Sequence, residues 1–299
     1  MRAGIDLGGT KIEGIILSDT GEILHRIRVA TPIDDYQQTI ESIGKIVSQL
    51  EKQAGRALNV GIGTPGTISH LTGRMKNCNS TCLNHHTLKH DLEQTLQREV
   101  KVENDANCFA LSEARYGAGK ESHSVFGVIL GTGVGGGLII GKQLLTGPNA
   151  IVGEWGHNQV PPYTDTLFPG RRRCYCGRSN CVESFLCGKG LEQTFVELGG
   201  APLLAETISK KSSEGNQLAN EALHIYCNQL AACLSTVVNI VDPQLIVFGG
   251  GLSNIDAIYE KVPELMLNYI FSDSVETRFV RPVFGDASGA RGAACLWAI

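Results

Sequence analysis

Short apolar runs, interrupted by glycine and aspartate, dominate the start of the chain. The stretch at 2–31 reads RAGIDLGGTKIEGIILSDTGEILHRIRVAT, with turn residues at Gly8-Gly9 and at 19–21. Apolar runs of this length that are bounded by turn residues are typical of β-strands. The pattern therefore predicts three short strands joined by tight turns.

A helical pattern follows these strands. In the segment 34–55, apolar side chains recur three and four positions apart, at Tyr36, Ile40, Ile43, Val47 and Leu50. This spacing predicts an amphipathic helix that ends near Gly55. A strand at 57–63, a helix around 88–99, a strand around 100–103 and a helix after Asp105 complete an α/β pattern.

The second half of the chain begins like the first. Aligned without gaps, residues 4–17 and 127–140 share Gly4/Gly127, Leu7/Leu130, Gly8/Gly131, Gly14/Gly137 and Ile16/Ile139. Two glycine-rich hairpins could match in this way by chance. The alternative is a duplicated hairpin, one per domain. Beyond it we expect a long helix at 217–241, a buried strand at 244–251 and a helix after Asn254.

Composition narrows the class of protein. The 299 residues are 42% hydrophobic and 19% charged, which is enough for two medium cores, and the net charge is −4. The single basic run, at 171–173, is too short to attract nucleic acid or anionic lipid. No apolar run approaches the roughly 20 residues of a membrane span. We therefore expect a cytoplasmic protein without a nucleic-acid or membrane partner.

Three of the ten cysteines cluster at Cys174, Cys176 and Cys181, downstream of His157 and just before Glu183. A disulfide framework is disfavoured because the cytoplasm keeps thiols reduced. A redox pair, a metal site and three unligated buried thiols remain open at this point.

Glycine-rich loops indicate anion binding. The pattern G-x-G-x-x-G occurs at 61–66 and again at 131–136. A dinucleotide fold needs a helix directly after such glycines, whereas the apolar run LIIGKQLL at 138–145 is strand-like, and a P-loop motif is absent from the sequence. Backbone amides of two tight hairpins could instead hold a polyphosphate.

Polar residues near these loops are candidates for the chemistry. Asp6 precedes the first turn, and Thr10 and Lys11 follow its glycines, so this hairpin is either an ordinary polar turn or a site for Mg²⁺ and a γ-phosphate. Asp105 opens a predicted helix, as a plain N-cap or as a general base. Glu154 and His157 could bind vicinal sugar hydroxyls or could lie in a surface turn.

Taken together, five motifs in this order resemble the ROK family of sugar kinases and repressors: DLGGTK, NDAN, GTGVGGG, GEWGH and CYCGRSNCVE. The resemblance implies an α/β, two-domain actin/hexokinase-like (ribonuclease H-like) fold with a deep interdomain cleft and a five-stranded sheet in each domain. It places a small domain at 1–118, completed by a C-terminal helix at 284–299. The larger domain, at 119–283, carries the cysteine loop.

Carried over position by position, the resemblance makes Asp105 the general base. It implies a sugar site formed by Gly66, Asn79, Asn104, Asp105, Glu154, His157 and Glu183. It implies that ATP and Mg²⁺ are held by Asp6, Gly8, Gly9, Thr10, Lys11, Gly131, Thr132 and Gly133, and the adenosine by Gly249, Gly250 and Gly251.

The resemblance also implies four zinc ligands, His157, Cys174, Cys176 and Cys181. A Zn²⁺ with four protein ligands has no open position and is structural. The family usually has glycine where Asn180 stands, and asparagine also tolerates a left-handed backbone. Because the implied ATP contacts lie outside the loop 157–181, we expect loss of the metal to weaken sugar binding far more than ATP binding.

The activity implied is ATP-dependent phosphorylation of a hexose at its 6-hydroxyl. The stretch KNCNSTCLNHH at 76–86 resembles fructokinases and mannokinases, which favours D-fructose, whereas NDANCFALSEA and GTGVGGGLI resemble N-acetylglucosamine kinases. N-acetylglucosamine and glucose are therefore the alternatives. A non-catalytic sugar sensor would not need Asp6 and Asp105. We expect a homodimer, and no DNA-binding segment precedes Asp6.

Overall fold

The computed structural model describes residues 1–78, 80–161, 167–168, 170–285 and 288–298. The chain forms two compact units, each an α/β unit. The first unit comprises Met1–Lys120, Lys142–Val152 and Val283–Ile299, and the second comprises Glu121–Gly141 and Gly153–Pro282.

The first unit is built on a five-stranded sheet in the order β3-β2-β1-β4-β7. Strands β1, β2 and β3 are antiparallel, as the opening pattern predicts, and β1, β4 and β7 are parallel. The strands of this unit are β1 (Arg2–Leu7), β2 (Lys11–Leu17), β3 (Ile23–Ala30), β4 (Val60–Thr64), β5 (Thr67–Ile68), β6 (Met75–Lys76), β7 (Val100–Asn104) and β10 (Gln143–Leu144). Its helices are α1 (Tyr36–Ala54), η1 (Thr81–Leu83), α2 (Leu88–Leu96), α3 (Asp105–Tyr116) and α9 (Ser288–Ala294).

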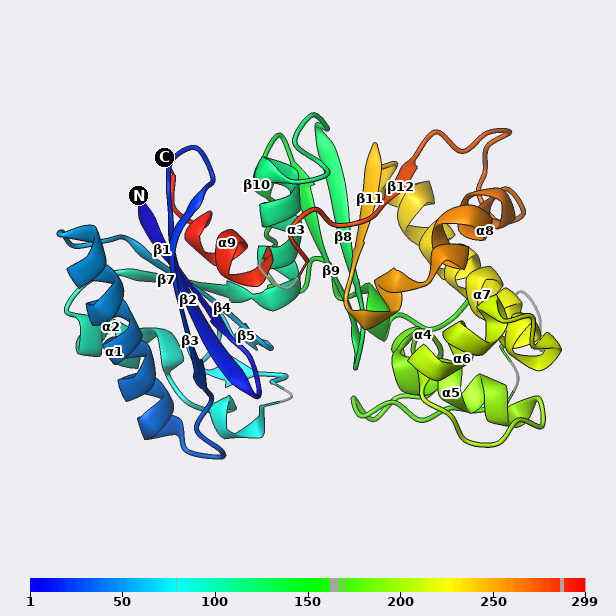
Figure 1. Cartoon of the computed structure of the whole chain (residues 1–299), viewed down its shortest axis with the longest axis horizontal. Helices are drawn as coiled ribbons and strands as arrows, with labels where there is room; N and C mark the ends of the chain where they lie inside the picture. The colour runs from blue at the N-terminus through cyan, green and yellow to red at the C-terminus, as the bar shows by residue number, and fades with distance from the viewer. Residues whose placement is uncertain (79, 162–166, 169, 286–287, 299) are drawn as a thin grey trace. The chain divides into compact units, whose positions relative to one another are not determined.

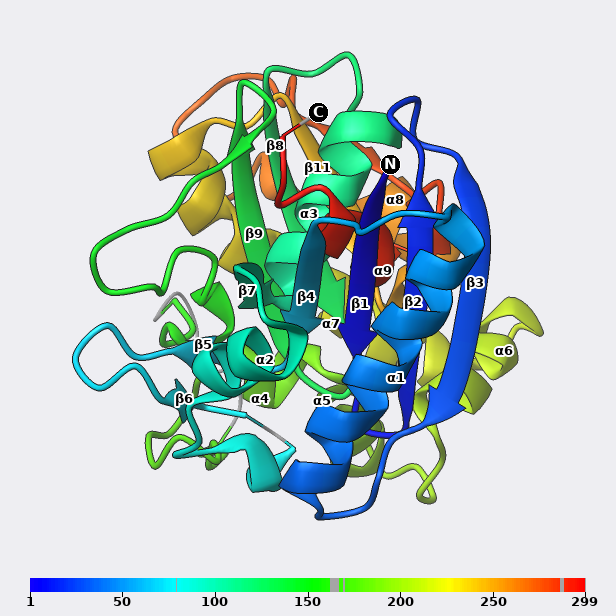
Figure 2. The same cartoon turned by 90° about the vertical axis from the view of Figure 1, so that its left-hand side faces the viewer.

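Helices cover both faces of this sheet. In Figure 2, α1 lies in front of β1 and β2, and α3 and α9 lie behind the sheet. The predicted amphipathic helix is α1, which buries Ile43 and Leu50 and ends at Gly55 with a left-handed φ of 68°. On the other face, α9 packs so closely on the sheet that a Cβ at Gly4 or Gly61 would lie 2.0 Å and 1.8 Å, respectively, from carbonyl oxygens of α9. These glycines are therefore required for the docking of α9.

A buried carboxylate fixes the segment that leads into α9. Glu113 of α3 is fully buried. Its oxygens accept hydrogen bonds from the backbone N–H groups of Val283 (3.0 Å) and Phe284 (3.1 Å) and from the hydroxyl of Ser288 (2.9 Å). It also accepts from the N–H of Ala118 at 3.1 Å. One side chain thus satisfies several backbone donors of two loops.

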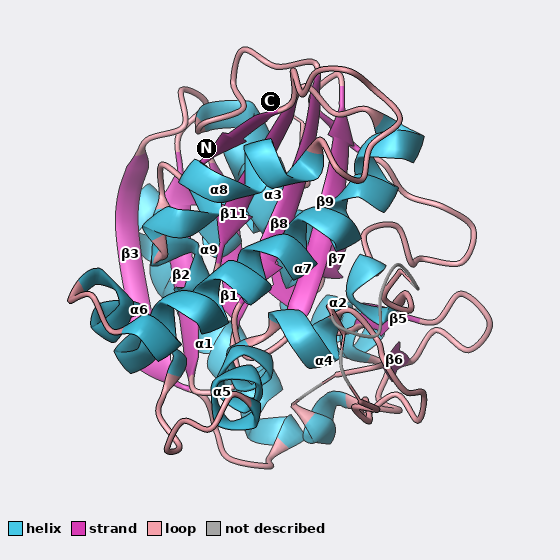
Figure 3. Cartoon of the chain, turned by 90° about the vertical axis from the view of Figure 1, so that its right-hand side faces the viewer, coloured by secondary structure: helices cyan, strands magenta, loops and turns pink. Residues whose placement is uncertain are grey.

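The second unit repeats the strand order of the first. The second five-stranded sheet has the order β10-β9-β8-β11-β12, in which β8 and β9 are antiparallel and β8, β11 and β12 are parallel. Its edge strand β10 belongs to the segment that groups with the first unit. Figure 3 shows α7 and α8 lying over one face of this sheet. The strands are β8 (Ser124–Leu130), β9 (Val134–Ile140), β11 (Leu245–Gly249) and β12 (Arg278–Val280). The helices are η2 (Trp155–His157), α4 (Glu183–Leu186), α5 (Gly188–Glu197), α6 (Ala205–Ser213), α7 (Gln217–Val241), η3 (Gly251–Asn254) and α8 (Asp256–Met266).

The short segment 142–152 groups with the first unit, whereas the sequence analysis placed it in the second. Lys142 provides a physical reason, because its Nζ donates hydrogen bonds to the carbonyl oxygens of Ala114 and Gly119, both at 3.0 Å. Figure 1 shows α3, whose last turn contains Ala114, next to β10. Among the helices that the structure describes, none is long and apolar enough to cross a membrane.

Candidate functional site

Several candidate residues of the first unit lie at one edge of its sheet. The parallel strands β1, β4 and β7 end together, since Asp6 pairs with Gly63 and Thr64 pairs with Asn104. The carboxyl ends of parallel strands are the usual place for ligands in such sheets. The sheet therefore brings Asp6 and Asn104 to the same edge, although 98 positions separate them in the sequence.

Asn104 and Asp105 divide two tasks at the start of α3. Asn104 is the N-cap, and its Oδ1 accepts from the N–H of Ala106 at 2.9 Å while its Nδ2 donates to the carbonyl of Gly66 at 3.1 Å. Gly66 has a φ of 75°, where glycine is favoured. Because Asn104 provides the cap, the carboxylate of Asp105 remains exposed at the first position of the helix. One oxygen of Asp105 also accepts from Ala106 N–H at 2.8 Å, which orients the carboxylate.

The first glycine turn lies next to this edge. The N–H of Gly8 donates to the carbonyl of Lys11 at 3.0 Å, and Gly9 and Thr10 are exposed. Asp6 lies on the face that α9 covers, where a Cβ at Gly289 would come within 2.8 Å of its carboxylate. Asn79, assigned to the sugar site from the sequence, lies outside the described residues.

The second glycine turn, Gly131 to Gly133, follows β8, and a glycine run, Gly249 to Gly251, follows β11. The N–H of Gly131 donates to the carbonyl of Gly133 at 3.0 Å. Gly250 has a φ of 81°, and a Cβ there would lie 2.4 Å from the carbonyl oxygen of Leu130. The missing side chain lets the two parallel strand ends approach each other, so both glycine runs lie together.

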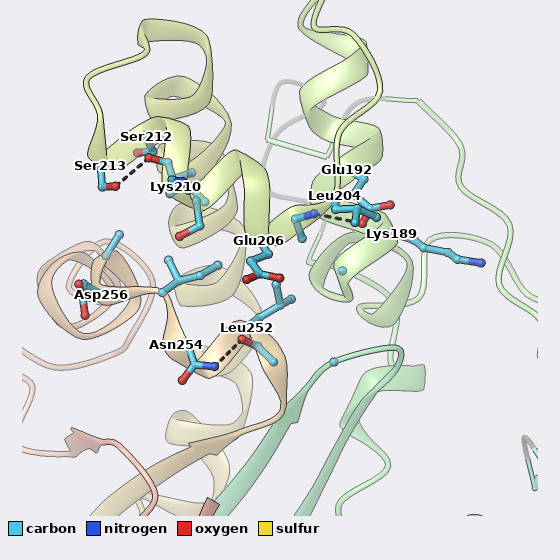
Figure 4. A pocket seen from close by; sticks show the side chains of 18 of the residues that line it. Lys189, Glu192, Leu204, Glu206, Lys210, Ser212, Ser213, Leu252, Asn254 and Asp256 are labelled. Carbon is cyan, nitrogen blue, oxygen red and sulfur yellow. Dashed lines mark hydrogen bonds between the residues drawn. The ribbon is translucent and has the colours of Figure 1, made fainter. Parts of the chain in front are cut away.

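A cavity of about 1130 Å³ adjoins these glycines within the second unit. Gly131, Thr132 and Gly251 line it, whereas Gly133, Gly249 and Gly250 are not among its described lining residues. In Figure 4, Glu206 extends from α6 toward Leu252 of η3. The sequence analysis did not single out Glu206 or the rest of α6, because no motif marks this short helix. The volume suits a nucleotide-sized ligand.

The GEWGH motif packs on β9. Cβ atoms at Gly153 and Gly156 would each lie 2.1 Å from carbonyl oxygens of β9, and the indole N–H of Trp155 donates to the carbonyl of Gly135 at 2.9 Å. The two glycines permit this approach, and the buried Trp155 anchors the segment. Glu154 and His157 on either side of Trp155 remain partly exposed.

The four residues expected to bind zinc come together in the second unit. The ligand atoms of His157, Cys174, Cys176 and Cys181 all lie within 4.8 Å of one another. Cys176 Sγ and Cys181 Sγ are 3.6 Å apart, and Cys174 Sγ is 3.6 Å from His157 Nδ1. A tetrahedral site with Zn–S bonds of about 2.3 Å has edges of about 3.8 Å. The donor set and its spacing therefore fit Zn²⁺.

Neighbouring groups support this cluster. Burial raises the pKa of Cys174 to about 12. Desolvation opposes ionisation of Cys176, but hydrogen bonds with Arg178, Cys174 and Cys181 together lower its pKa to about 6. The Nε2 of His157 lies 3.0 Å from the hydroxyl of Tyr175, leaving Nδ1 directed at the cysteines. Asn180 adopts a left-handed φ of 56°, as expected where the family usually has glycine.

Comparisons with known proteins agree with this arrangement. The model of the ROK family matches residues 2–299. An N-acetyl-D-glucosamine kinase of Vibrio cholerae is 39% identical over 301 residues, and one of Pasteurella multocida is 35% identical over 301 residues, each covering 99% of both chains.

Solved structures give the same picture. A ROK hexokinase from Thermus thermophilus superimposes with a TM-score of 0.86 at 28% identity, covering 98% of this chain and 96% of that one. A ROK family glucokinase from Streptomyces griseus, in complex with glucose and AMPPNP, gives a TM-score of 0.76 at 26% identity, covering 99% and 98%. With the family match over nearly its whole length, the chain belongs to the ROK family and has the actin/hexokinase-like fold.

Proposed function

We propose that this ROK-family sugar kinase transfers the γ-phosphate of ATP to the 6-hydroxyl of N-acetyl-D-glucosamine. The observation that carries the proposal is the identity of 35% to 39% with N-acetyl-D-glucosamine kinases over 99% of both chains. The sequence analysis preferred D-fructose from the stretch at 76–86. The comparisons favour its alternative, because full-length identity outweighs one loop that includes the undescribed Asn79.

Asp105 is the proposed general base. Its exposed carboxylate accepts the proton of the 6-hydroxyl while that oxygen attacks the γ-phosphorus and the bond to the β-phosphate oxygen breaks, releasing ADP. Support comes from Asn104, which caps α3 and leaves the Asp105 carboxylate accessible. The proposal keeps the sugar-binding roles that the resemblance implies for Gly66, Asn104, Glu154, His157 and Glu183.

The two glycine turns are the proposed phosphate sites. Exposed Gly9 and Thr10 offer an N–H and a hydroxyl. Asp6 lies two positions before the turn on its strand, where it can hold water of a hydrated Mg²⁺. Mg²⁺ would neutralise charge on the β- and γ-phosphates. The cavity beside Gly131, Thr132 and Gly251 is the proposed adenosine site, and its volume of about 1130 Å³ accommodates a nucleoside.

Zn²⁺ is the proposed occupant of the Cys₃His cluster, held by His157 Nδ1 and the thiolates of Cys174, Cys176 and Cys181. Support comes from the donor spacing of 3.6 Å in two of its pairs and from burial of Cys174 and Cys181. Four protein ligands leave no position for substrate, so the ion fixes the loop and takes no part in phosphoryl transfer.

A coupled ADP-release assay tests the proposed substrate. N-acetyl-D-glucosamine, D-glucose, D-mannose and D-fructose are compared by kcat/KM, and the Asp105→Asn variant measures the background. We expect N-acetyl-D-glucosamine to give the highest value and its 6-deoxy analogue to give no turnover. A higher kcat/KM for D-fructose would restore the preference drawn from the sequence and refute the proposal.

A further inference from the structure

We propose that Glu183 is a positioning residue for the nucleotide, because its carboxylate holds the turn Gly131 to Gly133 in shape. This inference rests on the proposed function only in taking the cavity beside that turn as the nucleotide site. It assigns Glu183 a second task besides the sugar contact that the resemblance implies.

The carboxylate of Glu183 contacts the turn directly. Its Oε2 accepts a hydrogen bond from the N–H of Val134 at 2.9 Å, and Val134 is buried, with 5% of its surface exposed. A Cβ at Gly133 would lie 2.7 Å from the same oxygen. A side chain at this position would therefore displace the oxygen that accepts from Val134 N–H. The carboxylate thus supplies an acceptor to a buried donor at the end of the turn.

A second hydrogen bond ties the other end of the turn to the same segment. The N–H of Gly188, at the start of α5, donates to the carbonyl of Gly131 at 2.9 Å. The segment 183–188 therefore contacts the turn both before and after its tip. Since Gly131 and Thr132 line the cavity, a shift of this segment alters the wall of the nucleotide site.

The cysteine cluster in turn fixes Glu183. Glu183 follows the fully buried Cys181 by two residues and begins α4. The Sγ of Cys174 lies 3.9 Å from Oε1 of Glu183, the carboxylate oxygen that does not face Val134. A metal ion on the cluster would hold these cysteines, and with them the backbone from which Glu183 extends. Loss of the metal should therefore weaken nucleotide binding as well as sugar binding, which differs from the expectation drawn from the sequence.

Two substitutions at Glu183 separate its two tasks. Glu183→Gln keeps a side-chain carbonyl oxygen that can accept from Val134 N–H, whereas Glu183→Ala removes the acceptor. We expect Glu183→Ala to lower the affinity for ADP, measured by calorimetry without sugar, by about tenfold, since it leaves a buried donor unpaired. Glu183→Gln should bind ADP within about threefold of the wild type because it keeps the hydrogen bond.

Glu154→Ala is the matched control, because Glu154 has the same proposed sugar role but lies just before η2, outside the segment 183–188 that contacts the turn. It should bind ADP like the wild type. Hydrogen exchange at 131–134 should become faster in Glu183→Ala and stay unchanged in Glu154→Ala. Equal ADP affinity and equal exchange in Glu183→Ala and the wild type would overturn the proposal.

Gly133→Ala provides a test in which Glu183 itself is not substituted. Its added methyl group meets the carboxylate oxygen, so the change displaces Glu183 from Val134 N–H in addition to altering the proposed phosphate turn itself. We expect a similar loss of ADP affinity, and wild-type affinity in this variant would refute the inference. These binding measurements are independent of which sugar is phosphorylated, so their failure is distinguishable from failure of the proposed function.

Discussion

The two glycine turns occupy the same place in their sheets but differ in length and in the origin of their carboxylate. The first turn places four residues, 8–11, between the paired residues Leu7 and Ile12. The second places three, 131–133, between Leu130 and Val134. The first has Asp6 on its own strand, whereas the second has no acidic residue in its hairpin and receives Glu183 from a segment 49 positions away.

This difference indicates two uses of a carboxylate beside the turns that we propose for phosphate binding. In the first turn the N–H of Gly8 donates to the backbone carbonyl of Lys11, and Asp6 is the residue that we propose for the ion that accompanies the phosphates. Glu183, in contrast, accepts a hydrogen bond from the backbone N–H of Val134 with one of its oxygens. Substitutions in the first unit should therefore act mainly on turnover, and substitutions around the second turn mainly on nucleotide affinity.

Asp105→Asn should produce the largest effect, and the quantity that falls should be kcat. Asparagine keeps the shape of the side chain but cannot take a proton, so kcat should fall by about 10²- to 10⁴-fold. Sugar affinity, measured by calorimetry, should change little. Turnover near that of the wild type would assign the base to another residue.

Asp6→Asn tests whether the first turn acts through Mg²⁺. Loss of the charge should lower kcat by about 10²- to 10³-fold, as for other electrostatic groups aimed at the reacting atoms. The Mg²⁺ concentration for half-maximal rate should rise, while ADP affinity in the absence of Mg²⁺ should stay the same. An unchanged Mg²⁺ requirement would remove the distinction between the two turns.

Glu113→Gln should act on stability rather than on either turn. Val283 and Phe284 donate to different oxygens of Glu113, so the amide accepts from one of them but presents its NH₂ group to the other. The free energy of unfolding should therefore fall by about 1.5–3 kcal/mol. Denaturant titration measures this change, and Glu121→Gln at an exposed position is the control. A variant as stable as the wild type would show that the buried carboxylate is not what holds the segment leading to α9.

Metal removal should produce the smallest of these effects, and the quantity that changes should be the affinity for ADP rather than kcat. A chelator, or Cys176→Ser, whose hydroxyl is a poor zinc ligand, should lower ADP affinity by about tenfold or less, because Glu183 is held less firmly. Metal analysis before treatment should find zinc, one ion per chain. Weakened sugar binding with unchanged ADP affinity would restore the expectation that the sequence alone supports.

Local sequence patterns predict many helices and strands of this fold. They do not predict the features that depend on contacts between residues far apart in the sequence, such as strand register. The helix α7 begins and ends where its apolar pattern predicts, at Gln217 and Val241. The repeat between the hairpins is visible in the sequence, but its ungapped alignment is wrong beyond the turn. Gly4 pairs with Ile15, whereas Gly127 pairs with Gly137, so Gly14 and Gly137 are not equivalent. The second turn is one residue shorter than the first, and only the pairing register of the two hairpins shows this.

The candidate site divides in the same way. The residues in short motifs come together at the strand ends and in the cysteine cluster. The hydrogen bond from Val134 to Glu183 escaped prediction because periodicity carries no information about which distant side chain satisfies a backbone donor. The cavity wall on α6 escaped it because Glu206 and its neighbours lie in a short polar helix without a motif.

The close docking of α9 has a consequence for how the chain folds during synthesis. The grooves at Gly4 and Gly61 are formed by strands made early, but their occupant, Ser288–Ala294, follows the whole second unit in the sequence. A ribosome that adds about 5–20 residues per second completes the second unit while the first still exposes an apolar strip. Nascent chains of this protein should therefore be most dependent on chaperones in the interval before their last helix emerges.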